Sequence, residues 1–333
     1  MEKKAKTKRA LVTGSTGFVG SHLVEALIAR GYEVVALVRE KSNRQWLKGL
    51  PVKIVLGDIM DKDSLSAAVR GCNYVYHLAG LTKAIKRSEY YLVNAVGTNN
   101  LIERWKSENT EVKRFLYVSS LAAIGPAENG VPIKEDQPPH PVSDYGKSKL
   151  KGEEVLKSYI KEVPITILRP GAIYGPRDRD ILHFFRWVKK GIQPLLGGEE
   201  RYVDLCHVND IIKGIILAAE TPTSSGETFF LASGVSYSWE KIGEIIAQAL
   251  GRKGKKVVIP YFLLALAASF AEVVGWLKGK PAPFNRQKLR EMQQKYWICD
   301  ISKARIQLGY RPQVSIGEGI KQTASWYIEN GWL

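Results

Sequence analysis

The sequence predicts an α/β fold, in which a doubly wound parallel sheet covered by helices is followed by a smaller carboxy-terminal substrate lobe. Short apolar runs alternate with stretches of helical periodicity through the first half of the chain. A glycine-rich turn, TGSTGFVG, follows the first apolar run and opens the first helical stretch. Alternating strands and helices indicate βαβ units, and a glycine-rich turn at this place is typical of the Rossmann type.

Six apolar runs of the first half are predicted to be strands. Each is short and nearly continuously apolar, as expected of strands that are buried on both faces of a parallel sheet. Helical stretches such as SHLVEALIARG and YYLVNAVGTNNLIERWKS separate them, so the crossovers should be right-handed. In chain order the strands are RALVTG (9–14), EVVALVR (33–39), VKIVLGD (52–58), NYVYHLAG (73–80), RFLYVSS (114–120) and PITILRP (164–170).

The second half of the chain has a looser pattern. Loops such as GPRDRD, PLLGGEERY and TPTSSGE interrupt short elements after about residue 175. We therefore expect residues 1–174 to form the dinucleotide-binding domain, and 175–333 to form mainly the substrate lobe, with later segments free to return to the sheet. The lobe should cover the carboxyl edge of the sheet, where open α/β sheets bind their ligands.

The composition is that of a soluble globular protein, with 45% hydrophobic and 25% charged residues among 333. Cys72, Cys206 and Cys299 are too scattered for a metal site or a disulfide framework, which favours the cytoplasm and no metal.

The opening MEKKAKTKR is too charged for a secretory signal. The formal charge of +16 is interpreted as a lysine-rich solvated surface, because no nucleic-acid-binding motif is present and no nucleic-acid partner is expected.

Gly14, Gly17 and Gly20 lie three residues apart between the first strand and the first helix. In such a turn one glycine allows the tight bend, the next lets a pyrophosphate approach the backbone, and the last lets the helix pack on the strand. The amides and the positive end of the helix would then face the phosphates. Thr16, Phe18 and Val19 belong to the same turn.

The spacing G-x-x-G-x-x-G resembles the fingerprint of the extended short-chain dehydrogenase/reductase family, which includes the NAD(P)-dependent epimerases and dehydratases and a 3β-hydroxysteroid dehydrogenase-like branch. Further landmarks follow in the family's order over nearly the whole chain, ending with CDISKARIQLGYRP. They are Asp58-Ile59 after the third strand, Leu78-Ala79-Gly80 after the fourth, Asn94 on the next helix, Ser119-Ser120 after the fifth strand, Tyr145-x-x-x-Lys149, and LRPGAIYGPRDR with Pro170 and Ile173.

The resemblance implies a role for each landmark. Asp58 would hydrogen-bond the adenine, and the loop after the sixth strand would touch the nicotinamide. Asn94 would steady the active-site end of its helix. The expected cofactor-binding residues are Gly14, Thr16, Gly17, Phe18, Val19, Gly20, Arg39, Asp58, Ile59, Leu78, Ala79, Gly80, Asn94, Tyr145, Lys149, Pro170 and Ile173.

Tyr145, Lys149 and Ser120 are the expected catalytic residues. A Y-x-x-x-K spacing places both side chains on one face of a helix, one turn apart. A tyrosine pKa near 10 is too high for a base at neutral pH, and a lysine ammonium about 5–6 Å away should lower it by about two units. Tyr145 would then exchange a proton with a substrate alcohol or ketone, while Ser120, rather than Ser119, orients the same oxygen.

The end of the second strand favours NADP over NAD. Folds that bind NAD usually place an acid there to accept hydrogen bonds from the adenosine ribose. Here Val38 takes that place and Arg39 follows, with Lys41 and Arg44 close behind. An arginine can pair with a 2′-phosphate in fork geometry, whereas an apolar side chain cannot bind the ribose hydroxyl.

The expected reaction is hydride transfer to or from a secondary alcohol or ketone of an apolar, steroid-, terpenoid- or flavonoid-like substrate. Leu121-Ala122 replace the acidic pair of the family's sugar dehydratases, so dehydration is not expected. A nucleotide-sugar 4-epimerase is the alternative, although Arg201 lies two residues too early for the epimerases' diphosphate anchor. A third possibility is a non-catalytic NADP-sensing regulator, against which the intact Tyr145 and Lys149 argue.

Two further expectations concern partners. Val257 to Leu277 is nearly long enough to span a bilayer, but Pro260 and Glu272 interrupt it. We expect a helix packed on the smaller lobe over the substrate cleft, with a lysine-flanked membrane entry gate as the alternative. The family resemblance also implies a homodimer, built from the YGKSK helix and the helix around 93–105.

Overall fold

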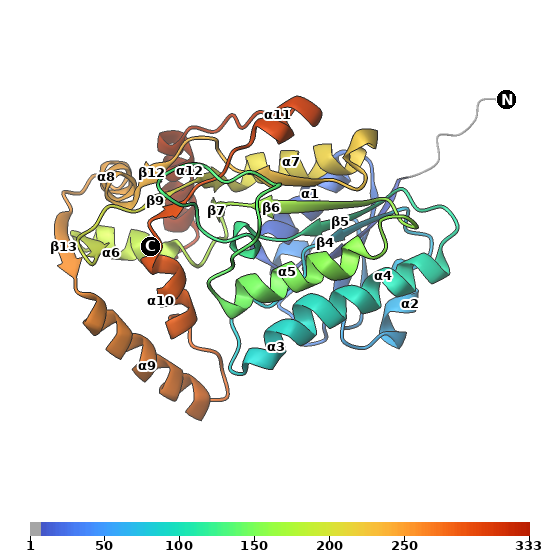
Figure 1. Ribbon diagram of the computed structural model, residues 1–333, viewed down its shortest axis with the longest axis horizontal. Helices are drawn as coiled ribbons and strands as arrows, with labels where there is room; N and C mark the ends of the chain where they lie inside the picture. Colours follow the sequence, from blue (N-terminus) through green and yellow to red (C-terminus); the bar gives the residue numbers. More distant parts are fainter. Residues whose placement is uncertain (1–7) are drawn as a thin grey trace.

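A seven-stranded parallel sheet forms the centre of the fold (Figure 1). The computed structural model describes residues 8–333, so residues 1–7 of the charged opening, in which no secretory signal is expected, lie outside the described part. The strand order is β11-β6-β5-β4-β1-β2-β3. The six predicted strands are confirmed, and a seventh comes from the second half of the chain. Their bounds are β1 Arg9–Thr13, β2 Glu33–Val38, β3 Val52–Leu56, β4 Tyr74–His77, β5 Arg114–Val118, β6 Ile165–Pro170 and β11 Thr228–Leu231.

Helices cover both faces of this sheet because its strands are apolar on both sides. Val12 of β1 packs in the cluster of α1 and α7, whereas its neighbour Leu11 packs in the cluster of α4 and α5. The predicted Rossmann-type doubly wound fold is therefore confirmed. One layer contains α1 Phe18–Ala29, α7 Val208–Glu220 and α11 Ser302–Gln307; the other contains α2 Ser66–Val69, α3 Arg87–Tyr91, the π-helical turn η3 Leu92–Val96, α4 Gly97–Glu108 and α5 Asp144–Lys157.

A smaller lobe continues from the carboxyl end of β6 and has its own core around Phe185, Ile242 and Tyr327. Because α7 and β11 return to the large sheet, the lobe is assembled from separated segments of the chain. The expected division of the chain into two domains after residue 174 stays a prediction. Its elements are β7 Ala172–Tyr174, α6 Leu182–Lys189, β8 Ile192–Leu196, β9 Tyr202–Val203, β10 Leu205–His207, β12 Tyr237–Ser238, α8 Trp239–Ala249, β13 Lys255–Ile259, α9 Tyr261–Leu277, α10 Arg286–Gln293, β14 Tyr296–Trp297 and α12 Ile316–Glu329. Short 3₁₀ turns are η1 Gln45–Leu47, η2 Asp63–Leu65, η4 Leu121–Ala123 and η5 Pro222–Ser224.

Helix α9 differs from the favoured expectation of a helix packed on the lobe. It stands at the edge of the molecule and joins the rest through β13 and α10 (Figure 1). Only its small side, at Ala268 and Gly275, is buried, while the side chains of Phe262 and Phe270 are 63% and 72% exposed. Among residues 8–333 no helix is long and apolar enough to cross a membrane.

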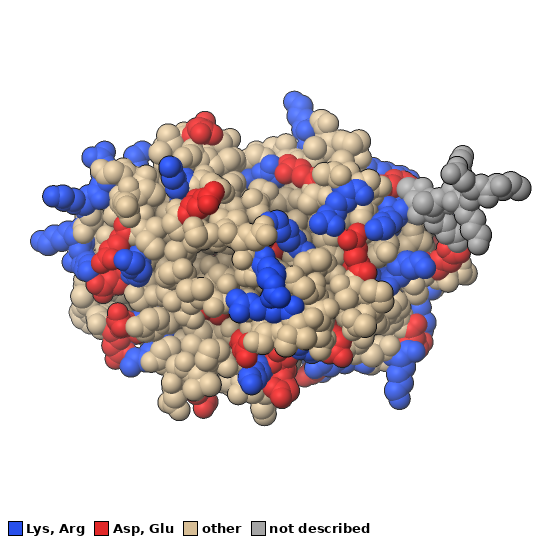
Figure 2. Space-filling model, turned by 90° about the horizontal axis from the view of Figure 1, so that it is seen from above, with Lys and Arg blue, Asp and Glu red and all other residues tan. Residues whose placement is uncertain are grey.

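The basic residues are spread over the face shown in Figure 2, with acidic side chains between them. Many surface lysines and arginines lie in exposed ion pairs, such as Lys62 with Glu103 and Lys151 with Glu154. The net charge of +16 is therefore not gathered into one continuous basic patch on this face, because acidic side chains lie between the basic ones.

Candidate active site

Most predicted site residues lie in segments that follow the carboxyl ends of six neighbouring strands, β1 to β6. In a parallel sheet these ends lie along one edge, and the chain connections reverse direction between β4 and β1. The turn after β4 is tied to β1, because the amide of Ala79 donates to the Thr13 hydroxyl at 3.1 Å. The topology thus brings the glycine turn and the segment Leu78-Ala79-Gly80 together at the switch point of the sheet.

The three glycines of the turn have separate structural reasons. Gly14 has a φ of 70°, and a Cβ there would lie 2.8 Å from the amide nitrogen of Ala79. A Cβ on Gly20 would lie 2.1 Å from the carbonyl oxygen of Gly14, so this glycine lets α1 pack on the turn. Gly17 begins α1 as its N-cap, and a Cβ there would approach only the Gly14 oxygen, at 3.2 Å. Gly17 is exposed, so this part of the turn leaves room for a ligand phosphate beside the helix amino terminus.

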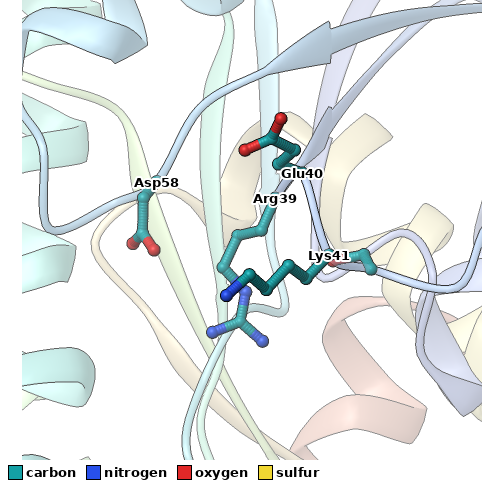
Figure 3. Close-up of a pocket in the computed structure, with 5 residues that line it drawn as sticks. Arg39, Glu40, Lys41 and Asp58 are labelled. Atoms are coloured by element: carbon teal, nitrogen blue, oxygen red, sulfur yellow. The ribbon is translucent and has the colours of Figure 1, made fainter.

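A cavity of about 420 Å³ lies at the end of β2, lined by Arg39, Glu40, Lys41, Ser42 and Asp58. Figure 3 shows the ends of the Arg39 and Lys41 side chains close together, with Asp58 across from them and Glu40 turned away. Two cations and a carboxylate in one cavity suit a ligand that has both a phosphate and an amino group.

The other predicted residues lie in several separate elements. Thr16, Phe18 and Val19 are half-buried at the start of α1. Ile59 is buried against Gly97 of α4, where a Cβ would lie 2.8 Å from its Cδ1. Pro170 ends β6, and Ile173 lies in β7, paired with β10.

Asn94 holds the loop after β4 from inside. Its side chain is buried, accepts from the Leu81 amide at 2.7 Å and donates to the Leu81 carbonyl at 3.0 Å. It also donates to the Ser148 hydroxyl on α5 at 2.8 Å. These bonds link the β4 loop, the π-helical turn and helix α5, so Asn94 holds these three segments together.

Helix α5 presents Tyr145 and Lys149 to the loop after β5. Its N-cap Ser143 accepts from the amide of Gly146 at 3.0 Å. A Cβ on Gly146 would lie 2.2 Å from the Ala122 carbonyl oxygen, so this glycine lets the helix press against that loop. The close approach brings Tyr145 beside the hydroxyl of Ser120, which acts to lower the pKa of the tyrosine.

Ser120, rather than Ser119, is the serine beside the tyrosine. The Ser120 hydroxyl also accepts from the amide of Ala122 at 3.1 Å, which fixes its direction at the start of η4. The buried Ser119 instead donates to a carboxylate oxygen of Glu153 at 2.5 Å. The two adjacent serines therefore face different partners, and only Ser120 lies beside Tyr145.

The pKa of Tyr145 is raised in this structure, whereas the spacing to Lys149 predicted that it would be lowered. Burial raises the pKa of Tyr145 to about 12, although its hydrogen bond with Ser120 acts in the opposite direction. Burial also lowers the pKa of Lys149 to about 7, while the negative charge of Glu153 acts to raise it. Loss of hydration disfavours the charged form of both groups, and this effect outweighs the pairing that the spacing suggested.

Lys149 nevertheless has partners that suit a cation. Its Nζ donates to the Val118 carbonyl oxygen at 2.8 Å and lies 4.0 Å from the centre of the Tyr117 ring. The lysine is therefore held against β5, one helical turn from Tyr145.

A buried ion pair beneath Lys149 was missed by the sequence reasoning. Arg169 of β6 donates two hydrogen bonds to Glu153 of α5, at 3.0 and 2.7 Å, and both side chains are buried. Glu153 lies four residues after Lys149, and Arg169 directly precedes Pro170 of the predicted nicotinamide loop. The i,i+4 spacing of Lys149 and Glu153 was the available signal, but pairing with Arg169 depends on the fold.

A second cavity, of about 540 Å³, lies between α9, α10, the loop after β4 and the start of α5. Asp144, which directly precedes Tyr145, lines it together with Tyr90, Ile85 and, from α9, Val273 and Trp276. The cavity therefore lies between the exposed helix α9 and the beginning of α5, directly before Tyr145. No group of three or more potential metal ligands occurs in the described residues 8–333.

Known proteins resemble this chain over nearly its full length. Ceramide reductase from Caulobacter vibrioides is 28% identical over 323 residues, covering 97% of this chain and 95% of the relative. The decarboxylating sterol-4-alpha-carboxylate 3-dehydrogenase of Bos taurus is 30% identical over 338 residues, covering 96% and 92%. The crystal structure of UDP-glucuronic acid 4-epimerase from Bacillus cereus, in complex with UDP-glucuronic acid and NAD, has a TM-score of 0.77 at 26% identity and covers 97% of this chain and 99% of its own.

The model of the NAD dependent epimerase/dehydratase family matches residues 10–232, from β1 to just after β11. The match takes in the glycine turn and the residues Ser120, Tyr145 and Lys149, and it covers more than half of the chain. The chain belongs to the NAD dependent epimerase/dehydratase family and is an NAD(P)-dependent enzyme of the dehydrogenase, reductase and epimerase kind.

Proposed function

We propose that this protein is an NADP-preferring oxidoreductase that transfers hydride to or from a secondary alcohol or ketone of an apolar substrate. The placement of Tyr145 beside Ser120, one helical turn from Lys149, is the observation that carries the proposal. It provides a proton donor or acceptor and an orienting hydroxyl at one point beside the cofactor groove.

The nicotinamide cofactor, when bound, accepts or supplies the hydride. Tyr145 takes the proton of the substrate alcohol during oxidation and returns it during reduction. Ser120 holds the same oxygen by a hydrogen bond, which keeps the carbon facing the groove. Lys149 carries positive charge beside the tyrosine when protonated, which favours the phenolate form. Gly17 and the start of α1 would hold the phosphates, and Asp58 the adenine.

The NADP preference is supported by the cavity at the end of β2. Arg39 and Lys41 reach into it together (Figure 3). Neither side chain forms an ion pair with an acid anywhere in residues 8–333, so both cations are free to bind a phosphate. Val38, in the place where NAD enzymes usually have an acid, is buried and apolar.

The apolar substrate class is supported by the state of Arg201. This arginine is only 5% exposed, and its guanidinium donates to the carbonyl oxygens of Leu196 and Glu199 and lies over the ring of Tyr261. An arginine engaged in this way is a poor anchor for a nucleotide diphosphate. Ceramide reductase and the sterol dehydrogenase among the relatives act, by their names, on lipid substrates.

A nucleotide-sugar 4-epimerase is the alternative, favoured by the likeness to the Bacillus cereus epimerase. An epimerase oxidises and reduces the same carbon, so the same three side chains would serve it and the cofactor would undergo no net change. A non-catalytic NADP-sensing regulator remains the third candidate.

One set of assays separates these functions. The protein is incubated with NADP and a panel of sterol- and terpenoid-like secondary alcohols, with NADPH and the matching ketones, and in parallel with UDP-sugars. We expect net change in reduced cofactor with the apolar substrates alone. Epimerised UDP-sugar without net cofactor change would support the alternative, and no turnover of either kind would support the regulator.

Replacement of Tyr145 tests the chemical role directly. Tyr145→Phe should lower kcat by about 10²-fold or more while cofactor affinity stays within about twofold, because only the phenol oxygen is lost. Tyr159→Phe is the matched control, since this tyrosine bonds to Asn99 and Glu103 away from the site. A Tyr145→Phe enzyme that keeps more than about a tenth of kcat would rule out the proton-transfer role.

We further propose a cytoplasmic location and a homodimer, with peripheral membrane contact. The location is supported by Cys72, Cys206 and Cys299, which are all buried as free thiols. Thiols that persist unpaired are typical of a reducing compartment.

A further inference from the structure

The apolar surface of α9 is the largest feature of the molecule that the proposed chemistry leaves unexplained. Apart from Tyr261 at its start, whose hydroxyl donates to the Leu196 carbonyl oxygen, the helix carries only two strongly polar side chains within its 17 residues, Ser269 and Glu272. Its exposed side chains recur every three or four residues and so form one stripe along one side. The stripe consists of Phe262, Leu263, Leu266, Phe270, Val273, Trp276 and Leu277.

Soluble proteins rarely leave such a continuous apolar stripe uncovered. A helix that is apolar nearly all round normally lies in a protein core or in lipid. The helix is about 25 Å long at 1.5 Å per residue, too short to span a bilayer but long enough to lie along its surface. Trp276, near the end of the stripe, is a residue type that favours the boundary between apolar and polar regions of a membrane.

The charges around the stripe are those that would meet an anionic surface. Glu272, the single acid of the helix, is neutralised by Arg286, which donates to it at 2.7 Å. Exposed basic residues lie before and after the helix and, in the described residues 8–333, form no ion pair. They are Arg252, Lys253 and Lys255 on one side, and Lys278 and Lys280 on the other.

The same charges argue against a second copy of the chain as the occupant of the stripe. Two copies that packed α9 on α9 would bring two sets of unpaired basic residues toward each other, and like charges in contact are unfavourable. An anionic lipid surface would instead attract each of them.

We propose that α9 docks the protein on an anionic lipid bilayer, with its stripe in the interfacial layer and the flanking lysines among the headgroups. The cavity of about 540 Å³ lies against the same helix, lined by Val273 and Trp276, and reaches Asp144 at the start of α5. Docking through α9 therefore puts the mouth of this cavity at the lipid surface, next to the helix that carries Tyr145. The role as a substrate entrance depends on the proposed apolar substrate, whereas the docking itself does not.

Vesicle flotation tests the docking without any substrate, so its failure would leave the proposed chemistry untouched. The full-length protein is mixed with vesicles of phosphatidylcholine alone, or of phosphatidylcholine with about a third of phosphatidylglycerol. We expect flotation with the anionic vesicles at low salt, several-fold less at high salt, and little with the neutral ones. Protein that stays unbound with anionic vesicles at low salt would overturn the proposal.

Matched variants locate the contact. Phe262→Ser/Phe270→Ser removes two exposed rings that do not line the cavity and should lower vesicle partitioning by about tenfold or more. Lys278→Glu/Lys280→Glu should do the same through charge, since each lysine near an anionic surface contributes about fivefold. The controls are Ile306→Ser/Ile328→Ser, on the exposed faces of α11 and α12, and Lys53→Glu/Lys113→Glu, on the far edge and end of the large sheet.

We expect the NADPH affinity to be unchanged in all variants, which would show that each one folds. If the two α9 variants float as the wild type does, α9 is not the docking surface. If Phe262→Ser/Phe270→Ser instead converts a dimer into a monomer when vesicles are absent, the stripe is an interface between copies, and the proposal is wrong.

Discussion

Arg39 and Glu40 are neighbours in the chain, but their side chains leave the backbone on different sides of the cavity at the end of β2 (Figure 3). Arg39 and Lys41 therefore dominate the charge of the space where the adenosine ribose of a bound cofactor is expected. A dianionic 2′-phosphate gains from both cations, whereas a ribose hydroxyl needs an acceptor that Val38 cannot provide. At this scale the proposed NADP preference depends on the side chains of Arg39 and Lys41.

Arg39→Ala should raise the Kd for NADPH by about 10- to 100-fold, since a hydrogen bond to a charged group contributes about 1.5–3 kcal/mol. The Kd for NADH should change by no more than about threefold, because the lost partner is the phosphate. Arg44→Ala is the control: it removes a cation of the same loop that does not line the cavity. Fluorescence titration with both cofactors makes the measurement. Equal wild-type affinities for NADPH and NADH, unchanged in Arg39→Ala, would contradict the NADP preference.

The pair of Glu153 and Arg169 joins two elements, the catalytic helix α5 and the strand β6 that leads into the expected nicotinamide loop. Both side chains are buried, and Glu153 accepts from Ser119 as well. The two charges neutralise each other in a buried place, although Nη1 of Arg169 has no hydrogen-bond partner in the described residues, so removing one charge leaves the other uncompensated. The same carboxylate raises the pKa of Lys149 against the effect of burial.

Glu153→Gln should therefore lower the free energy of unfolding by about 3–5 kcal/mol, measured by urea denaturation. The pKa of Lys149, followed by NMR of the labelled lysine side chain, should fall further below about 7 because the nearby negative charge is gone. Glu154→Gln is the control on the same helix: its exposed pair with Lys151 contributes less than about 1 kcal/mol. A Glu153→Gln protein with wild-type stability and an unchanged Lys149 pKa would show that the pair does not support the site.

The elements differ in how far the sequence predicts them. The strands from β1 to β6 could be predicted because each is a local apolar run. The tight turn at Gly14 could be predicted because a glycine adopts the positive φ that such a turn requires. The pairing of Glu153 with Arg169 joins residues from separate elements, so no local pattern contains it. The pKa values of Tyr145 and Lys149 depend on burial, which spacing does not report. The exposure of α9 was not predicted for a related reason. An apolar run in the sequence predicts a buried helix but does not show which element would cover it.

At the scale of the whole molecule, one layer of helices has exposed apolar side chains on its outer surface. The layer of α3, α4 and α5 lies side by side along one face of the sheet (Figure 1). The π-helical turn between α3 and α4 exposes two apolar side chains, Leu92 and Val96, at 46% and 45%. The segment 93–105 and α5 are the helices expected to pair in a homodimer. An interface there would lie behind the catalytic helix and leave both the cofactor groove and α9 open.

This arrangement predicts a dimer in sedimentation experiments at micromolar concentration, with twice the mass of the 37.2 kDa chain. Leu92→Glu/Val96→Glu should weaken it by at least about tenfold, because two charges would be buried in the contact. Both side chains are exposed in one chain, so the variant should keep its fold and its NADPH affinity. Ile306→Glu/Ile328→Glu, on the opposite layer and the smaller lobe, is the control and should sediment as the wild type does. A wild-type protein that sediments only near 37.2 kDa would remove the dimer and leave Leu92 and Val96 as ordinary surface residues.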